Sequence, residues 1–223
     1  RMLRCYAREA QLCLIQGGSV EQIDTVLQSF GMAMGPLSVG DLTGLDIGYK
    51  ARQSLTDEEK GAPETFMITD TLVEMGRLGQ KTGAGYYRYD PKTRKRVTDP
   101  EVMEIVCKVA DDLNVPRKKL SNEEILNRHL FALVNEGMKI LEEGIAQRPG
   151  DIDVVYVNGY GFPAHKGGPM YLADTVGIKT VYASVCNFRD MYGDAYWTPA
   201  PLLEQLAQEN RTLSQWAVDQ SQN

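Results

Sequence analysis

The chain has 223 residues, of which 43% are hydrophobic and 24% are charged, proportions typical of a protein that folds around an apolar core. Its formal net charge of −6 argues against nucleic acid as the main partner, because phosphate backbones are bound by basic faces. The apolar runs all fall short of the ~20 residues that a membrane-spanning helix needs.

Cysteine and histidine usage points away from the common metal and disulfide frameworks. No cysteine forms a C-x-x-C pair or clusters with a histidine in the sequence. We therefore predict no metal site, and we favour unpaired thiols in a reducing compartment over disulfides. The residues concerned are Cys5, Cys13, Cys107, Cys186, His129 and His165.

The chain contains one sequence pattern twice, which favours two related halves. The fuller copy runs from Glu123 to Gly177, and about the first 46 residues are a degenerate copy of it. The gaps between the two copies fall only where loops are expected. The matched positions are Arg1 with Arg128, Glu9 with Glu136, Gly17 with Gly144, Ile23-Asp24 with Ile152-Asp153, Gly35-Pro36 with Gly168-Pro169, Asp41 with Asp174, and Gly44 with Gly177.

The first copy predicts three helices. Residues 1–16 carry apolar side chains at helical spacing and end at a Gly-Gly pair. Residues 19–22 predict a capping box, in which the Ser19 hydroxyl and the Gln22 amide satisfy exposed backbone donors of the second helix.

The third helix of each copy opens at a Gly-Pro pair, with proline at the first helical position. Asp41 in the first copy and Asp174 in the second follow soon after. We interpret both as acids that suit the positive, N-terminal end of the helix dipole.

The region between the copies is less regular. Helical spacing continues to about residue 75, and Gly76–Asp90 then combines four glycines with Tyr86, Tyr87 and Tyr89, which predicts tight turns and a short extended segment. A basic run follows, for which we favour a solvated turn over a phosphate-binding role. The run consists of Lys92, Arg94, Lys95 and Arg96.

The second half is also helical. Asp99-Pro100 opens a helix, and we place the domain boundary there, with a first domain at residues 1–97 and a second at residues 98–223. Ser121–Glu124 predicts another capping box at the start of a long helix. No stretch alternates for long enough to predict a substantial sheet, so the expected class is all-α. Further helices are expected at residues 151–157, from Gly168-Pro169, and at residues 202–207.

Little in the chain indicates catalysis. There is no G-x-S-x-G nucleophile elbow. His129 lies beside the apolar stripe of a helix, which favours packing, and His165 lies in a glycine-rich loop, which favours a structural role. Lys81, between glycines, could meet a phosphate, but it lacks the order and context of a P-loop.

Three motifs nevertheless carry a resemblance. FGMAMGPLSVGDLTGLDIG (Phe30–Gly48), GQKTGAGYYRYD (Gly79–Asp90) and the 127–177 segment together resemble the C-terminal helical domains of L-3-hydroxyacyl-CoA dehydrogenases. The two-copy arrangement resembles the multifunctional enzymes of fatty-acid β-oxidation. The resemblance covers nearly the whole chain and implies two tandem, homologous helical domains packed as a pseudo-dimer.

The resemblance also implies a larger, monomeric parent that acts on 3-hydroxyacyl-CoA in peroxisomes. Such a parent carries an enoyl-CoA hydratase/isomerase domain and an NAD-binding Rossmann domain upstream. The family's catalytic His, Glu and Asn would all precede Arg1, so we expect the isolated chain to hold no catalytic residue and to be inactive. The peroxisomal targeting tripeptide of the family is not found at the end of this sequence, Asp219–Asn223.

Three residues match ligand-contacting positions of the family. Lys81 matches a lysine that reaches the cofactor NAD, and its alternative role is that of a solvated loop lysine. Met34 and Pro36 would lie near the acyl chain, with helix packing as the alternative. Asn127-Arg128 repeats the family's Asn-Arg pair in the second copy, where we expect a structural role.

A second hypothesis is a non-catalytic helical scaffold or dimerisation module that keeps the fold and binds protein partners. A Rossmann fingerprint upstream would favour the enzyme. We also expect Pro149–Gly177 to help bury the face that a partner subunit covers in single-copy relatives.

Overall fold

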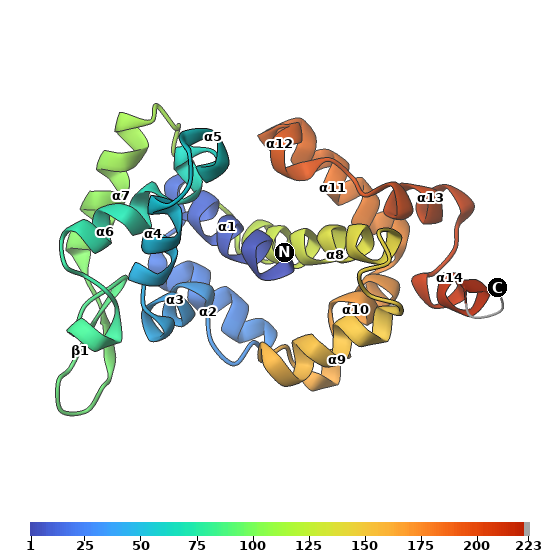
Figure 1. The fold of residues 1–223 in the computed structure, drawn as a ribbon, viewed down its shortest axis with the longest axis horizontal. Coiled ribbons are helices and arrows are strands. Elements are labelled where there is room, and N and C mark those ends of the chain that lie inside the picture. Colours follow the sequence, from blue (N-terminus) through green and yellow to red (C-terminus); the bar gives the residue numbers. More distant parts are fainter. Residues whose placement is uncertain (221–223) are drawn as a thin grey trace. The chain divides into compact units, whose positions relative to one another are not determined.

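The computed structural model describes residues 1–220, and most of these lie in helices (Figure 1). The only sheet among them has two strands, so the all-α prediction is confirmed. In chain order the elements are α1 (Met2–Ile15), α2 (Val20–Phe30), α3 (Pro36–Thr43), α4 (Asp46–Gln53), α5 (Asp57–Lys60), η1 (Pro63–Thr65), α6 (Met67–Glu74), η2 (Gln80–Thr82), β1 (Tyr87–Tyr89), β2 (Arg96–Thr98), α7 (Pro100–Asp112), α8 (Asn122–Glu142), α9 (Pro149–Gly159), η3 (Ala164–Lys166), α10 (Pro169–Val176), α11 (Ile178–Tyr192), α12 (Asp194–Trp197), α13 (Pro201–Glu209) and α14 (Leu213–Gln220), where η marks a 3₁₀ helix.

The chain divides into two compact units. Unit 1 comprises Arg1–Tyr6, Phe30–Ala33 and the chain from Leu126 onward, and unit 2 comprises Ala7–Ser29 and Met34–Ile125. Helices α1, α2 and α8 each begin in one unit and end in the other. The boundary between homologous copies at residues 97 and 98 stays a prediction.

In unit 2 a buried carboxylate caps helix α3. Asp24, on α2, accepts hydrogen bonds from the backbone amides of Leu37 at 2.9 Å and Ser38 at 3.0 Å. These are donors of the first helical turn that have no partner within the helix. A side chain at Gly35 would overlap Asp24, so the close approach of the two segments requires glycine.

The second copy repeats this arrangement inside unit 1. Asp153, on α9, accepts hydrogen bonds from the backbone amides of Met170 at 2.7 Å and Tyr171 at 3.0 Å, at the start of α10. A side chain at Gly168 would overlap Asp153. The repeated Ile-Asp and Gly-Pro pairs are therefore one capping device used twice, which gives the internal repeat a physical basis.

Asp41 and Asp174 do not act on their own helices, so the dipole interpretation was wrong. Asp41 lies late in α3, and its carboxylate accepts hydrogen bonds from the amides of Tyr86 at 2.8 Å and Tyr87 at 3.0 Å. Asp174 accepts bonds from the amides of Leu213 at 2.7 Å and Ser214 at 2.9 Å, at the start of α14. Each carboxylate thus holds a later segment of the chain.

The two predicted serine caps form. The amides of Gln22 and Glu124 donate to the hydroxyls of Ser19 at 3.1 Å and Ser121 at 3.0 Å. The Gln22 side chain donates instead to the Leu120 carbonyl at 3.1 Å. The prediction of a reciprocal bond to Gln22 was wrong, because its side chain is instead turned toward Leu120 and Asn122, to which its NH2 group donates.

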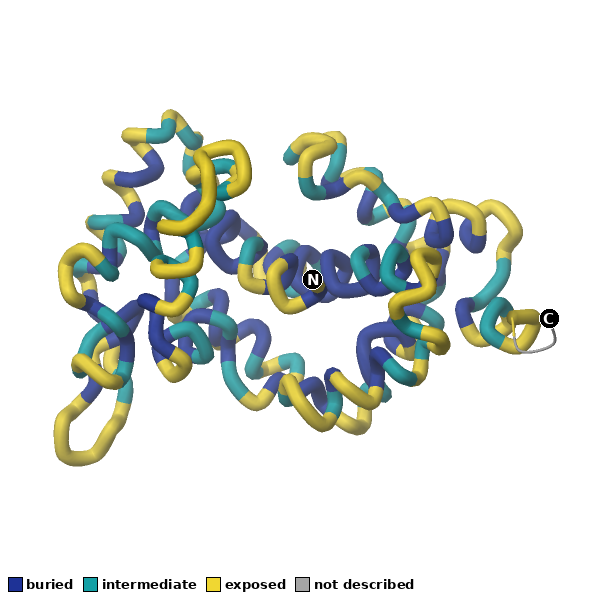
Figure 2. Tube along the Cα trace, in the orientation of Figure 1, coloured by how far each residue is buried: buried dark blue, intermediate teal, exposed yellow. Residues whose placement is uncertain are grey.

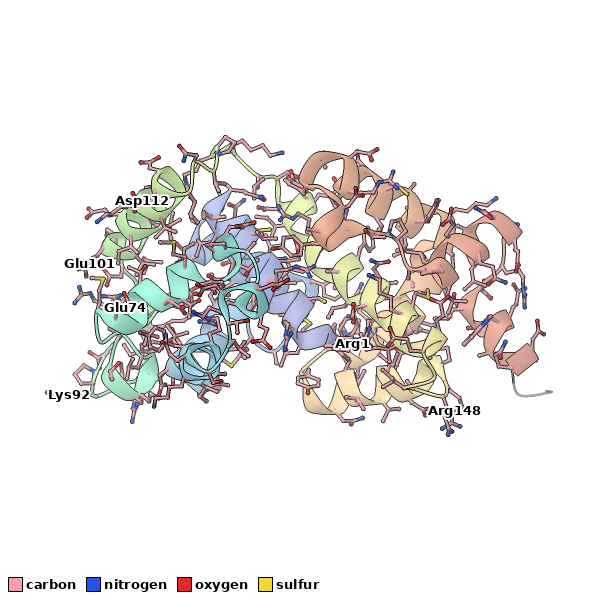
Figure 3. The ribbon with its side chains drawn as sticks, turned by 45° about the horizontal axis from the view of Figure 1, so that its top comes forward. Arg1, Glu74, Lys92, Glu101, Asp112 and Arg148 are labelled. Carbon is pink, nitrogen blue, oxygen red and sulfur yellow. The ribbon has the colours of Figure 1, made fainter. Side chains whose placement is uncertain are left out.

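The tyrosine segment forms the predicted short strand, β1, which pairs antiparallel with β2. The Asp90 carboxylate accepts the amides of Lys92 at 3.0 Å and Thr93 at 2.6 Å, which closes the turn between the strands. Figure 3 shows Lys92 at the end of this hairpin. Arg96 was predicted to lie in a solvated turn. Instead, its guanidinium donates a hydrogen bond to the Gln28 side chain at 2.7 Å.

Helix α8 supplies much of the core of unit 1, and its middle is almost continuously buried (Figure 2). The side chain of Asn135 is buried yet satisfied, because it donates to the Thr198 carbonyl at 2.9 Å and accepts from the Ala200 amide at 2.8 Å. His129 is fully buried, with its ring 5.2 Å from that of Tyr6, in the packing role that its apolar stripe predicted.

We predict that the two capping aspartates contribute unequally to stability. Asp24→Ala should lower the free energy of unfolding by about 3 kcal/mol, because two buried amides and the Tyr87 hydroxyl, 2.9 Å away, lose their acceptor. Asp153→Ala should lower the free energy of unfolding by about 1–2 kcal/mol, because only the cap of α10 is lost. Burial also raises the pKa of Asp153 to about 6, which weakens the ionised cap near neutral pH.

Urea unfolding followed by circular dichroism measures these differences. Asp57→Ala is the control, because Asp57 is exposed and pairs only with Lys60 at 2.9 Å; its change should stay within about 0.5 kcal/mol. Equal losses for Asp24→Ala and Asp57→Ala would show that the buried cap does not stabilise the fold.

Candidate functional site

Lys81 lies on the short helix η2, in a loop that its neighbours hold in one conformation. The flanking residues Gly79 and Gly83 have φ angles of +101° and +77°, which favour glycine. The Thr82 hydroxyl donates to the Ala84 carbonyl at 3.1 Å and accepts from the Leu78 amide at 2.9 Å. The backbone that carries Lys81 is therefore fixed by its own loop.

The loop also packs closely against helix α3. A Cβ atom at Gly79 would overlap the backbone of Asp41, and one at Gly85 would overlap the Asp41 carboxylate. That carboxylate holds β1, and burial raises its pKa above the usual range of an aspartate. The position of Lys81 thus depends on Asp41 and on two glycines.

The Lys81 ammonium forms an ion pair with Asp46, the first residue of helix α4. The other oxygen of the same carboxylate accepts a hydrogen bond from Lys50 at 2.9 Å. The two lysines, Lys81 foremost, lower the pKa of Asp46 to about 2. The group is ionised at neutral pH, and the cluster of Lys50, Lys81 and Asp46 has a net charge of +1.

This lysine cluster can bind an anion. The Lys81 side chain is 47% exposed, whereas that of Asp46 is only 10% exposed, so the carboxylate lies beneath the ammonium. Lysine contacts an oxygen anion as a flexible point charge. The alternative role of Lys81 was that of a solvated loop lysine. Lys81 is partly exposed, as that alternative expects, but it is also ion-paired with Asp46.

Met34 and Pro36 lie at the other end of α3. Pro36 is its first residue, Met34 precedes it, and both are half-buried. The eight residues of α3, Pro36–Thr43, correspond to about 12 Å of helix. Gly44, which follows directly, is the residue that approaches Lys81. The structure therefore places the proposed acyl contacts and the proposed cofactor contact at opposite ends of one helix, and their roles stay predictions.

Sequence reasoning missed Asp46 and Lys50. A signal for them was present, because an acid four residues before a lysine places both side chains on the same face of a helix. The link between Asp46 and Lys81 joins residues 35 positions apart and has no local signature.

The remaining polar candidates do not gather into a site. His165 is exposed on η3, and Asn127 is half-buried on α8. No group of three or more potential metal ligands lies together in residues 1–220. In the same part of the chain, no helix combines the length and apolar character needed to cross a membrane.

Comparison with protein families decides the classification. Residues 1–89 and 125–215 both match the family described as 3-hydroxyacyl-CoA dehydrogenase, C-terminal domain. The chain belongs to this family. The double match confirms that it carries two tandem dehydrogenase C-terminal domains, as the internal repeat indicated.

Several relatives share this dehydrogenase domain. The chain is 41% identical to the peroxisomal bifunctional enzyme of Homo sapiens over 97% of this chain and 32% of the relative. It is 36% identical to the fatty acid oxidation complex subunit alpha of Vibrio campbellii over 88% of this chain and 27% of the relative. The chain thus spans about a third of the length of the curated relatives it matches.

A solved structure supports the dehydrogenase fold. The dehydrogenase part of multifunctional enzyme 1 from C. elegans superimposes with a TM-score of 0.72 at 27% identity, covering 92% of this chain and 46% of that chain.

We predict that the two glycines beside Lys81 differ in their tolerance of alanine. Gly79→Ala should lower the free energy of unfolding by about 3 kcal/mol or more. The new Cβ atom would overlap α3, and the backbone at this position has a positive φ that alanine disfavours. Gly83→Ala should cost only about 1 kcal/mol, since its Cβ would meet open space. Thermal unfolding of both variants tests this, and equal costs would contradict the close packing of the loop on α3.

Proposed function

We propose that this chain is the C-terminal helical part of a multifunctional enzyme of fatty-acid β-oxidation. The parent combines enoyl-CoA hydratase with NAD-dependent L-3-hydroxyacyl-CoA dehydrogenase activity and resides in peroxisomes. The observation that carries the proposal is the match of both copies to the dehydrogenase C-terminal domain. The names of the relatives, a peroxisomal bifunctional enzyme and a fatty acid oxidation subunit, supply the substrate class.

Within the parent, this chain supplies one wall of the dehydrogenase site. In residues 1–220 no G-x-G-x-x-G motif follows a strand and opens a helix, so the proposed role of this chain is that of a wall and does not include the nucleotide fold. NAD, when bound, accepts the hydride from the 3-hydroxyacyl group. Lys81 contacts the cofactor, and the net positive charge of its cluster fits an anionic group. Met34 and Pro36 line the path of the acyl chain.

The side chain of Arg1 is clamped by two carboxylates of the second copy. Arg1 donates from its Nε atom to Glu136 at 2.6 Å and from Nη2 to Glu143 at 2.9 Å. Both acids lie on or directly after α8, in the second copy. In the proposed enzyme, this clamp fixes the start of α1 against the second copy.

The second copy stabilises the first in place of a partner subunit, as a pseudo-dimer within a monomeric parent. Contacts within unit 1 support this role. The rings of Phe30 and Phe162 lie 5.7 Å apart, and the Ala33 amide donates to the Gly161 carbonyl at 3.1 Å. The end of α2 and the loop before η3 thus share one core, although they come from different copies.

We expect activity only when the chain follows its NAD-binding domain. In that full-length protein, Lys81→Ala should raise the KM for NAD about 3- to 10-fold and leave kcat within about twofold, because a ground-state ionic contact is lost. Steady-state kinetics with a 3-hydroxyacyl-CoA measures both.

Lys60→Ala is the matched control, because Lys60 is also ion-paired on a helix but belongs to α5. A full-length protein that folds but does not oxidise 3-hydroxyacyl-CoA would overturn the enzyme and favour the scaffold. An active protein indifferent to Lys81→Ala would remove only the cofactor contact.

A further inference from the structure

We propose that Lys50 and Lys81 together form a two-cation site for a phosphate group, with Asp46 as the residue that positions both. This proposal rests on the proposed function and extends it by adding Lys50 as a second ligand contact beside Lys81. The phosphate would belong to NAD or to the CoA part of the substrate, which share this chemistry.

The two ammonium groups are brought together by a single carboxylate. Lys81 pairs with Oδ1 of Asp46, and Lys50 pairs with Oδ2 at 2.9 Å. They reach it from different elements, since Lys81 comes from η2 and Lys50 lies one turn beyond Asp46 on α4. Both ammonium groups therefore lie within reach of one small anion.

The carboxylate is shielded, whereas the cations face outward. The side chains of Lys50 and Lys81 are 75% and 47% exposed, compared with 10% for Asp46. An approaching anion would meet the two positive groups first. The net charge of +1 is left for the ligand to balance.

Both ammonium groups also have donors that a ligand can use in place of water. Each ammonium has three donors, and each pairs with one oxygen of Asp46. The remaining donors suit a group with several acceptor oxygens, and charge-assisted bonds to phosphate are among the stronger hydrogen bonds in proteins. A phosphate can use both lysines at once, whereas a hydroxyl of a ribose needs only one.

Gly44 keeps one side of the cluster uncovered. A Cβ atom at this position would lie 2.9 Å from Nζ of Lys81 and 3.0 Å from Oδ1 of Asp46. Its φ of +100° is also one that other residues rarely adopt. Glycine thus leaves room beside the ammonium where a side chain would crowd it.

The test uses the full-length protein with Lys50→Ala, Lys50→Arg, Lys81→Ala and the control Lys60→Ala. Lys50→Ala should raise one KM about 3- to 10-fold with kcat within about twofold, and Lys50→Arg should restore most of the loss because it keeps the charge. A rise in the KM for NAD assigns the phosphate to the cofactor, and a rise in the KM for 3-hydroxyacyl-CoA assigns it to the substrate.

A second readout does not depend on activity. Acetylation of each lysine by acetic anhydride is followed by mass spectrometry without ligand, with saturating NAD, and with saturating CoA. Lys50 and Lys81 should both be protected by the same ligand at least threefold, while Lys60 should react at an unchanged rate.

The outcomes separate this proposal from the one on which it rests. If Lys81→Ala raises a KM but Lys50→Ala does not, and Lys50 is not protected, the two-cation site is wrong while the dehydrogenase stands. If the protein shows no dehydrogenase activity, the proposed function falls. Protection of Lys50 and Lys81 by one ligand would still support the phosphate site in that case, and its absence would overturn it.

Discussion

The structure depends on buried aspartates that accept backbone amide hydrogen bonds from distant segments. Asp24 holds the start of α3, and Asp41, near the other end of the same helix, holds β1. Each satisfies donors that would otherwise be buried without a partner, at a cost of about 1–3 kcal/mol per group. Helix α3 is short, with eight residues, and these long-range bonds fix its place where its own length could not.

The candidate site inherits its geometry from this arrangement. Asp24 sets the end of α3 near Pro36, and Asp41 sets the end near Gly44 and the loop that carries Lys81. The acyl contacts and the cofactor contact of the proposed enzyme are thus spaced by one rigid helix. In the second copy, Asp174 accepts backbone amides of α14 in the way that Asp41 accepts those of β1. The repeat thus keeps the amide-accepting aspartate, although the second copy has no equivalent of the loop that carries Lys81.

The sequence predicted the parts of this structure that local rules govern. Proline at the first position of α3 and α10, serine caps and helical spacing located most helices, and the repeated Ile-Asp and Gly-Pro pairs revealed the two copies. It failed where the partner is far along the chain. The acceptor role of Asp41 joins residues 45 positions apart, and Arg96 leaves a turn that looks solvated to reach Gln28. The cofactor role of Lys81 came from resemblance, and nothing local connects this lysine with Asp46.

Amide hydrogen exchange at Tyr86 and Tyr87 tests most directly the claim that Asp41 fixes the lysine loop. Both amides donate to Asp41, so they should exchange slowly in the wild type and at least tenfold faster in Asp41→Ala, with a smaller effect in Asp41→Asn. The amides of Met170 and Tyr171, held by Asp153, should not change. Equal exchange rates at Tyr86 and Tyr87 in all three proteins would contradict the account.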